Sequence, residues 1–226
     1  MNSKNIYLIL PAFNEASVLE KVLAEVIKSG YHIVVVNDGS EDDTAKILEH
    51  FPITIINHSI NLGQGAALQT GMDWAKIKDA EIVIHFDADG QHYADDVENL
   101  LKPVLDGECD LAIGSRFLNS KNAVPFFRKQ ILRMATFIES IFTGIKLTDA
   151  HNGLRALNKK ALHSIQLSEN RMAHATELIS QAKRSNLRIK EVAVRVSYTN
   201  YTMQKGQGLL GGVHIIFNLL FKKITK

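Results

Sequence analysis

The sequence predicts an α/β fold with a doubly wound, mostly parallel sheet and helices on both faces. In the first half of the 226 residues, short apolar runs alternate with longer segments of helical periodicity, which is typical of βαβ units. Runs such as Ile33–Val36 are apolar on both faces, as expected for strands buried between two layers of helices. With 46% hydrophobic and 22% charged residues, the chain can bury a substantial core.

Five strands and four helices follow from this alternation. We expect strands over Ile6–Leu10, His32–Val36, Ile53–Asn57, Glu81–Phe86 and Asp110–Gly114. We expect helices between them over Ala16–Ser29, Asp42–His50, Gly65–Lys76 and Ala94–Leu105. In the first of these helices the apolar residues recur every three or four positions, so one face packs on the core and the other is solvated.

The pattern changes from Pro125 onward. This half is expected to hold a long apolar and basic helix over Phe126–Phe142, a loop over Thr148–Gly153, a helix over Ala175–Ser185 and a strand over Arg188–Val196. No linker-like boundary, repeat or low-complexity tract interrupts it. The chain is therefore expected to form one main domain over residues 1–205.

The last segment, residues 206–226, has apolar side chains at helical spacing and ends with Lys222, Lys223 and Lys226. A basic amphipathic helix of this kind can lie in a membrane interface. The segment could equally pack on the domain's own surface or in a dimer interface, and an integral-membrane partner is a further alternative.

Composition excludes several classes of protein. Lys and Arg number 26 against 24 Asp and Glu, and this net charge of +2 lacks the cationic excess typical of nucleic-acid binding. The single cysteine, Cys109, can form neither an internal disulfide nor a cysteine-based zinc site. There is no export signal and no run of roughly 20 apolar residues. We therefore expect a cytoplasmic protein that is soluble or sits on a membrane without crossing it.

Polar residues follow every predicted strand of the first half. The five loops read PAFNE, NDGS, NHSINLG, DADGQH and GSR. Asp-Gly pairs are common in turns, so turn chemistry accounts for some of this pattern. Because ligands of open parallel sheets bind beyond the carboxyl ends of the strands, five such loops on one edge predict a binding site there.

The DADGQH loop predicts a metal site. In extended backbone Asp87 and Asp89 lie on one face, so both carboxylates can reach one hard cation. Mg²⁺ and Mn²⁺ sites commonly use one or two carboxylates, with waters and substrate phosphates completing the shell. Gln91 and His92 could complete the shell or bind phosphate, and His92 fits equally well as a surface turn residue.

Other nucleotide-binding folds are excluded by their missing motifs. The loop after the first strand has no G-x-G-x-x-G, and the glycines that follow the third strand have Leu68 where the last glycine should be. The chain has no G-x-x-x-x-G-K-[ST] sequence either. A nucleotidyltransferase is disfavoured, because no glycine-rich basic loop is present to bind a triphosphate.

Taken in order, the segments PAFNE, VVNDGSEDDT, NLGQGAALQTG, DADGQH, GSRF and TDAHNGLRA resemble the inverting family 2 glycosyltransferases. Within that family they are similar to the polyprenyl-phosphate branch, which includes dolichyl-phosphate mannose synthase. The resemblance covers roughly residues 4–205 and implies a GT-A fold. It also implies transfer of a sugar from a UDP- or GDP-sugar to a polyprenyl phosphate at the cytoplasmic membrane face, with Mg²⁺ or Mn²⁺; we favour UDP.

The resemblance also implies roles for individual residues. The nucleotide-sugar site would comprise Pro11, Ala12, Asn14, Glu15, Asp38, Asp87, Ala88, Asp89 and Lys205. Within it, Asp38 would hydrogen-bond the base and Lys205 would close over the pyrophosphate. The metal would be held by Asp87, Asp89 and Gln91, and the acceptor phosphate by Arg116, Arg128 and Lys129. The catalytic residues would be Asp149, Arg116 and Asp89, with Arg155 supporting the Asp149 loop.

The role of Asp149 depends on the acceptor. A lipid phosphate is already anionic at neutral pH, since its second pKa lies near ~6, whereas a sugar hydroxyl needs a positioned base. Asp149 would then orient the phosphate or act as the base, and it also fits as a helix cap or turn residue. The alternatives are a glycosyltransferase acting on a hydroxyl of a surface glycan, and a non-catalytic nucleotide-sugar-binding subunit of a membrane complex. Retention of the acidic and basic motif residues favours an enzyme.

Overall fold

The structure is a computed structural model that describes residues 5–119, 124, 126–170 and 173–198. Lys205 and the expected helix over 206–226 lie outside the described residues. One sheet of seven strands runs through the described part in the order β3-β2-β1-β4-β6-β5-β7. The strands are β1 (Ile6–Ala12), β2 (His32–Asn37), β3 (Thr54–Asn57), β4 (Ile82–His85), β5 (Leu111–Ser115), β6 (Arg155–Asn158) and β7 (Ile189–Ala193).

Six of the seven strands run parallel, and β6 runs against its neighbours β4 and β5. The expected α/β class and mostly parallel sheet are therefore confirmed. The helices are α1 (Ala16–Val26), α2 (Thr44–Leu48), α3 (Gln64–Ile77), α4 (Asp96–Leu105), α5 (Phe126–Thr143), α6 (Lys159–Ser164) and α7 (His174–Arg184), with a 3₁₀ turn η1 (Ile27–Ser29) extending α1.

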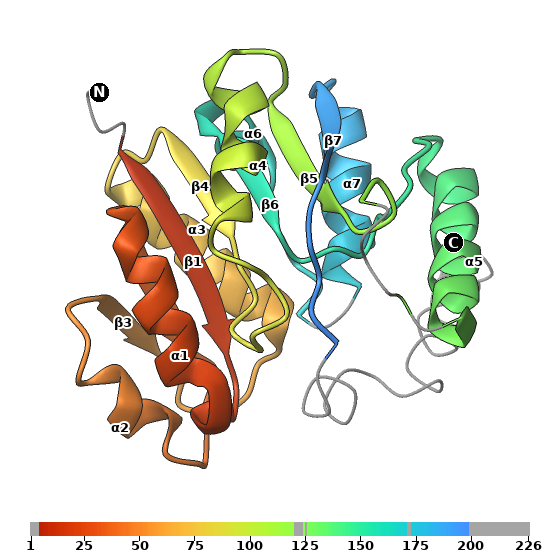
Figure 1. Ribbon diagram of the computed structural model, residues 1–226. Helices are drawn as coiled ribbons and strands as arrows, with labels where there is room; N and C mark the ends of the chain where they lie inside the picture. The colour runs from red at the N-terminus through yellow and green to blue at the C-terminus, as the bar shows by residue number, and fades with distance from the viewer. Residues whose placement is uncertain (1–4, 120–123, 125, 171–172, 199–226) are drawn as a thin grey trace.

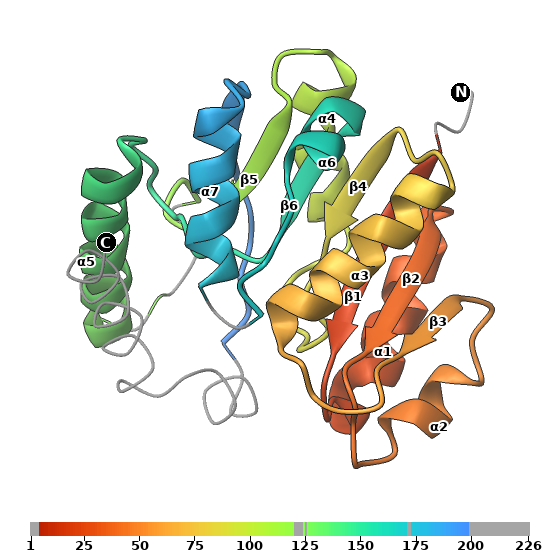
Figure 2. The same ribbon diagram turned by 180° about the vertical axis from the view of Figure 1, so that it is seen from behind.

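Helices cover both faces of the sheet. Figure 1 shows α1 and α4 in front of the sheet, and Figure 2 shows α3, α6 and α7 on the opposite face. Side chains of β1 alternate between these layers: Leu8 and Leu10 pack with α1 and α4, and Tyr7 and Ile9 pack with α3. Gly71 of α3 lies so close to Ile9 that an added Cβ would be 2.3 Å from Cγ2.

β6 and α6 were not predicted from the sequence. β6 has only four residues, and its sequence, RALN, lacks the alternation of apolar and polar residues that is typical of a strand. Asn158 ends the strand and caps the next helix, because its side-chain oxygen accepts a hydrogen bond from the Ala161 N–H at 2.9 Å. An Asn followed by KKALHS was the one signal that could have located α6.

Helix α5 lies beside α7, at the end of the molecule remote from α1 and α2 (Figures 1 and 2). Large apolar side chains on its outer face are 49 to 74% exposed, namely Phe126, Phe127, Met134, Phe137 and Ile141. None of the helices in the described part of the chain is long and apolar enough to span a bilayer. Part of the apolar character expected for this helix therefore lies on its exposed face in the described part of the chain.

Candidate active site

The direction of β6 determines which loops meet. Parallel strands β1, β2, β4 and β5 bring their carboxyl-end loops to one edge of the sheet. Because β6 is antiparallel to β4 and β5, the residues that precede it, 148–154, lie at that same edge. The antiparallel strand thus places the TDAHNG segment beside the residues that follow β4 and β5.

The loops after β1 and β2 are joined through Asn14. This residue has a φ of +53°, a backbone region that Asn tolerates better than most residues. Its Oδ1 accepts a hydrogen bond from the Glu41 N–H at 2.8 Å, and its own N–H donates to Ser40 Oγ at 3.0 Å. The Glu15 N–H donates to Thr44 Oγ1 at 2.9 Å. These contacts fix the first loop before any ligand binds.

Pro11 and Ala12 are the last two residues of β1 and pair in register with Val36 and Asn37 of β2. Ala12 is 1% exposed, whereas Pro11 is half-buried at the loop edge. The side chain of Glu15 is also buried, and its charge acts on Asp89. The structure therefore brings the predicted first-loop residues next to the predicted metal loop.

Asp38 is buried at 2% exposure, and this chain itself occupies much of its carboxylate. Oδ1 lies 2.7 Å from His58 Nδ1 and accepts a hydrogen bond from the Leu62 N–H at 2.9 Å, and Oδ2 accepts one from the Gly63 N–H at 2.7 Å. His58 Nε2 is 3.0 Å from Thr70 Oγ1 of α3. A carboxylate has about four acceptor positions, so one remains for the predicted contact with a base.

Asp87 and Asp89 follow β4 with the buried Ala88 between them. Gln64 Nε2 donates a hydrogen bond to Asp87 Oδ1 at 2.8 Å, and His92 Nε2 lies 3.4 Å from Oδ2. Burial by itself raises the pKa of Asp87, but the hydrogen bond and charge of His92 hold it below its ordinary value. Burial and the negative charge of Asp87 together raise the pKa of Asp89 to about 6.

These residues fit a divalent cation. Burial and the repulsion between the two neighbouring carboxylates raise the pKa of Asp89, and a cation between them would remove that repulsion. Gln91 is within reach, since its N–H and side-chain Nε2 both donate to Asp89. In the described part of the chain no three or more His, Cys, Asp or Glu residues gather as a complete metal cage. Two carboxylates with substrate phosphates and water are the donor set typical of Mg²⁺.

Gly153 leaves room for Asp87. A Cβ at position 153 would lie 1.9 Å from Asp87 Oδ2, so any side chain there would displace the carboxylate. The loop that carries Asp149 therefore packs directly against the residue expected to hold the metal. This close approach explains the glycine of the TDAHNGLRA segment, which the sequence alone left without a role.

Arg116 and Asp149 form a buried pair, 33 residues apart in the chain. Asp149 Oδ2 accepts hydrogen bonds from Arg116 Nε at 2.6 Å and from its backbone N–H at 3.0 Å. Burial lowers the pKa of Arg116, but the charges and hydrogen bonds of Asp149 and Tyr198 together outweigh burial and raise it overall. The opposite oxygen, Asp149 Oδ1, has no hydrogen-bond partner among the described residues.

Two arginines of α5 lie close to this pair. Arg128 stacks over the ring of Tyr198 at 5.3 Å, and the Tyr198 hydroxyl is 3.4 Å from Arg116 Nη1. Arg133 lies over the ring of Phe117 at 5.7 Å. The structure thus brings the predicted Arg128 toward Arg116, and it adds Arg133, which the sequence analysis missed. Lys129 is half-buried on the same helix.

A buried cation lies below the site. Arg155 of β6 is 1% exposed and pairs in register with His85 of β4. Its Nε and Nη1, and both ring nitrogens of His85, have no hydrogen-bond partner in the described chain. Burial lowers the pKa of Arg155, and the charges of Asp87, Glu139 and Asp149 act against that effect. The positive charge of Arg155 therefore acts on Asp87 as well as on Asp149, whereas the sequence analysis assigned it only to supporting the Asp149 loop.

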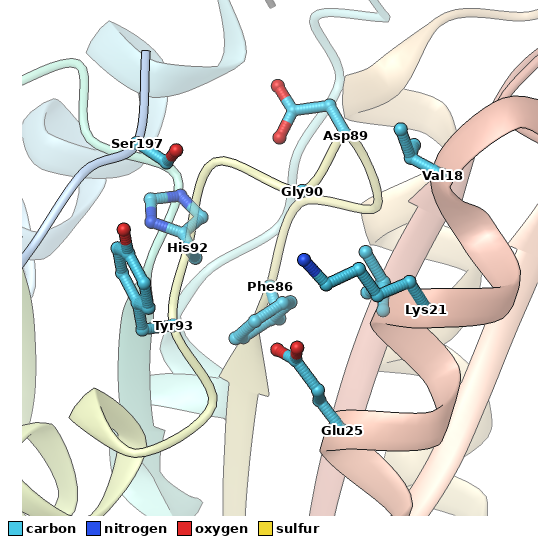
Figure 3. A pocket seen from close by; sticks show the side chains of 10 residues that line it. Val18, Lys21, Glu25, Phe86, Asp89, Gly90, His92, Tyr93 and Ser197 are labelled. Atoms are coloured by element: carbon cyan, nitrogen blue, oxygen red, sulfur yellow. The ribbon is translucent and has the colours of Figure 1, made fainter. Parts of the chain in front are cut away.

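A cavity of about 190 Å³ lies behind the Asp87–Asp89 loop. Figure 3 shows Lys21 and Glu25 of α1 on one side of it, His92 and Tyr93 on the other, and Phe86 between them. Residues of α1 line this cavity, whereas neither Arg116 nor Asp149 is among its lining residues. This cavity separates α1 from the Asp87–Asp89 loop.

Comparison with known proteins agrees with this arrangement. A family model described as Glycosyl transferase family 2 matches residues 7–166. The chain is 34% identical over 248 residues to a UDP-N-acetylglucosamine–dolichyl-phosphate N-acetylglucosaminyltransferase of Methanococcus voltae, covering 100% of this chain and 99% of that protein. It is 29% identical over 170 residues to a polyprenol monophosphomannose synthase of Mycolicibacterium smegmatis, covering 71% and 64%.

The fold has a solved counterpart. A glucosyl-3-phosphoglycerate synthase from Mycobacterium tuberculosis, in complex with Mn²⁺, UDP and glucosyl-3-phosphoglycerate, superposes with a TM-score of 0.73. The match covers 96% of this chain and 79% of that one, at 19% identity, so it confirms the GT-A fold. The expected resemblance to the polyprenyl-phosphate branch is confirmed by relatives so named. The chain belongs to glycosyl transferase family 2 and is a glycosyltransferase.

Proposed function

We propose that this enzyme transfers one sugar, with inversion, from a nucleotide-sugar to a polyprenyl phosphate, using Mg²⁺ or Mn²⁺. The observation that carries the proposal is the meeting of two motifs at one sheet edge. The Asp87–Asp89 loop and the Arg116–Asp149 pair are joined there by the contact of Gly153 with Asp87. Two carboxylates that could hold the metal and donor diphosphate thus lie next to Arg116, which could bind the acceptor phosphate.

The donor is a UDP-sugar in preference to a GDP-sugar. The proposed nucleotide contacts come from Pro11, Ala12, Asn14, Glu15 and Asp38, with Ala88 between the two metal-binding carboxylates. A solved fold neighbour holds UDP and Mn²⁺, and the Methanococcus voltae relative is named for a UDP-sugar. Lys205, outside the described residues, is proposed to close over the pyrophosphate.

The residues account for an inverting displacement. As the sugar leaves, negative charge develops on the nucleoside diphosphate, and cations that face this group lower the barrier. The metal held by Asp87, Asp89 and Gln91 would neutralise that charge when bound. Arg116 is held in place by Asp149, so its guanidinium needs no reorganisation during the reaction.

The acceptor is proposed to be a polyprenyl phosphate. Three cationic residues are available to hold its phosphate. Arg116 and Arg128 both contact Tyr198, and Lys129 follows Arg128 on α5. A phosphate monoester with a second pKa near ~6 is already nucleophilic at neutral pH, so no base is required. Asp149 then acts by orienting Arg116, which agrees with the two hydrogen bonds that its Oδ2 accepts.

We place the enzyme at the cytoplasmic face of the membrane. The uncovered apolar residues of α5 lie on the same helix as Arg128 and Lys129, which suits a lipid whose phosphate enters the site while its chain stays in the bilayer. The segment 206–226 is proposed to bind the membrane surface or an integral-membrane partner. Neither role involves nucleic acid.

One observation favours a second acceptor. Asp149 Oδ1 is buried and has no hydrogen-bond partner among the described residues, so it could accept the proton of an incoming hydroxyl. On this second proposal the acceptor is a sugar hydroxyl of a surface glycan, and Asp149 is the general base.

The test uses purified protein with Mn²⁺, a panel of labelled UDP- and GDP-sugars, and a short polyprenyl phosphate. Label in the organic phase with one donor would support transfer to the lipid phosphate and identify the sugar. The matched control is Asp89→Asn, which should abolish both the metal dependence and the lipid product. Label transferred only to a glycan would overturn the lipid acceptor in favour of the hydroxyl.

A further inference from the structure

Helix α5 buries its one acidic residue. Glu139 is the single Asp or Glu in the helix sequence FFRKQILRMATFIESIFT, and it is 1% exposed. Removing a carboxylate from water is costly unless it is paired. On the outer face of the same helix, apolar side chains are exposed instead. This inversion of the usual amphipathic pattern indicates that the carboxylate has a specific task inside the protein.

The partner of Glu139 is His151, which lies in the loop that carries Asp149. Glu139 Oε2 and His151 Nε2 are 3.2 Å apart, with side chains 2% and 6% exposed. The two atoms are in contact but not oriented as a hydrogen bond, so neither has a hydrogen-bond partner among the described residues. Burial raises the pKa of Glu139 to about 7 and lowers that of His151 to about 4. The other charged or polar groups that act on Glu139 are Arg155 of β6 and Thr176 of α7.

The pair closes a ring of contacts around the acceptor side of the site. From α5, Arg128 stacks on Tyr198, whose hydroxyl lies 3.4 Å from Arg116 Nη1. Arg116 in turn binds Asp149. Two residues after Asp149, His151 contacts Glu139, which lies on α5. The helix also packs on α7 and places Arg133 over the ring of Phe117, so these two contacts add to a wider attachment of α5 to the described body of the protein.

We infer that Glu139 and His151 are positioning residues that fix α5 relative to Asp149. The pair would thereby set the separation between Arg128 on the helix and Arg116 on the sheet edge, the two cations proposed to hold one acceptor phosphate. This inference rests on the proposed function, because it assigns the pair to acceptor binding and leaves the nucleotide side unaffected.

The experiment compares three substitutions in the full chain. Glu139→Leu removes the polar group, Glu139→Gln keeps a hydrogen-bonding side chain of the same shape, and His151→Leu removes the partner. Thr136→Val is the matched control, since Thr136 is buried one turn earlier on the same helix and its hydroxyl has no hydrogen-bond partner among the described residues. Thermal unfolding identifies any variant that does not fold.

Binding of farnesyl phosphate and of UDP with Mn²⁺ is measured by calorimetry, and KM values for both substrates by transfer. We expect Glu139→Leu and His151→Leu each to weaken farnesyl phosphate binding about tenfold, with the Kd of UDP within twofold of wild type. The double variant should be no weaker than either single variant. Glu139→Gln should restore most of the affinity, and Thr136→Val should match the wild type.

Three results would overturn the inference: unchanged lipid-phosphate affinity in folded Glu139→Leu, an equal loss of UDP affinity, or additive losses in the double variant. Wild-type protein that bound farnesyl phosphate without transferring sugar to it would overturn the proposed function alone. Wild-type protein that did not bind farnesyl phosphate would overturn both.

Discussion

The two ends of β5 each carry an Asp–Arg pair with a buried carboxylate, and the pairs differ in how completely that carboxylate is satisfied. Asp110 precedes the strand and binds Arg188, whereas Arg116 follows the strand and binds Asp149. Both aspartates are at most 2% exposed. The same two residue types thus lie at opposite ends of one strand, because Asp110 and Arg116 directly flank the five residues of β5.

At the Asp110 end both carboxylate oxygens are used. Oδ1 accepts hydrogen bonds from Arg188 Nη2 and Asn158 Nδ2 at 3.0 Å each, and Oδ2 accepts from the Arg188 N–H at 2.9 Å. Lys160 Nζ is 3.5 Å away. These partners hold the pKa of Asp110 far below its ordinary value. Such saturation is what a structural ion pair requires.

At the Asp149 end only one oxygen is used. Oδ2 accepts hydrogen bonds from Arg116 and from Asn152, and Oδ1 is buried without a partner in the described chain. A buried acceptor left open costs free energy, so it is retained where a ligand or a reaction needs it. The Asp149 end, which is proposed to be reactive, is thus distinguished from the Asp110 end by its open carboxylate oxygen and by the burial of its arginine.

The largest effect is expected at the open pair. Asp149→Asn keeps the shape but removes the charge that holds Arg116, so kcat should fall about 100-fold or more. Steady-state transfer assays checked by circular dichroism measure this. A folded Asp149→Asn variant with wild-type kcat would show that the two ends of β5 do not differ in function.

A smaller effect, on stability alone, is expected at the saturated pair. Asp110→Asn should lower the free energy of unfolding by about 2 kcal/mol, because Arg188 and Asn158 lose a charged acceptor, and kcat should stay within twofold of wild type. Urea unfolding measures the difference.

The same pair predicts a pH dependence. The folded-state pKa of Asp110 is depressed, so its stabilisation is complete above the pKa of the unfolded chain and is lost as pH falls below about 4. The stability difference between wild type and Asp110→Asn should therefore shrink on acidification from pH 6 to pH 3. A difference that stayed constant over this range would contradict the assignment of the ion pair.

The smallest effect is expected at Tyr198. Its hydroxyl lies 3.4 Å from Arg116 Nη1, a long hydrogen bond, and its ring supports Arg128. Tyr198→Phe removes the hydroxyl and keeps the ring, so the KM for the lipid acceptor should rise about threefold with kcat unchanged. If Tyr198→Phe raised the KM for the lipid acceptor more than Asp149→Asn does, Tyr198 would contribute more to acceptor binding than the Arg116–Asp149 pair.

Much of the fold could be predicted because hydrophobic periodicity is a local signal. The parallel strands and their helices follow from apolar runs that are buried in the structure. β6 was missed since its four residues are too short for a period to show, and its antiparallel direction depends on pairing with β4 and β5. Asp87 and Asp89 could be assigned to a metal because their spacing is written in the sequence itself.

Other parts of the site depend on contacts between distant segments. The Arg116–Asp149 pair, the Glu139–His151 pair and the stacking of Arg133 on Phe117 join residues that no local pattern relates. Asp38 was predicted to contact the base, and the structure adds that it first anchors the loop that ends at Gly63. Its contact with the base stays a prediction.

The reversed strand has a consequence for how this enzyme can diversify. β5 ends and β6 begins at the same edge, and their residues pair directly, Ile113 with Arg155. The segment between them, residues 116–154 with α5, is therefore an insertion between two adjacent antiparallel strands, and its two ends lie close together. Between Arg116 and Asp149 such an excursion can lengthen or shorten without shifting any strand's register, at a loop-closure cost that grows only slowly with length. The part of the chain proposed to bind the acceptor can thus vary while the part proposed to bind the nucleotide stays unchanged.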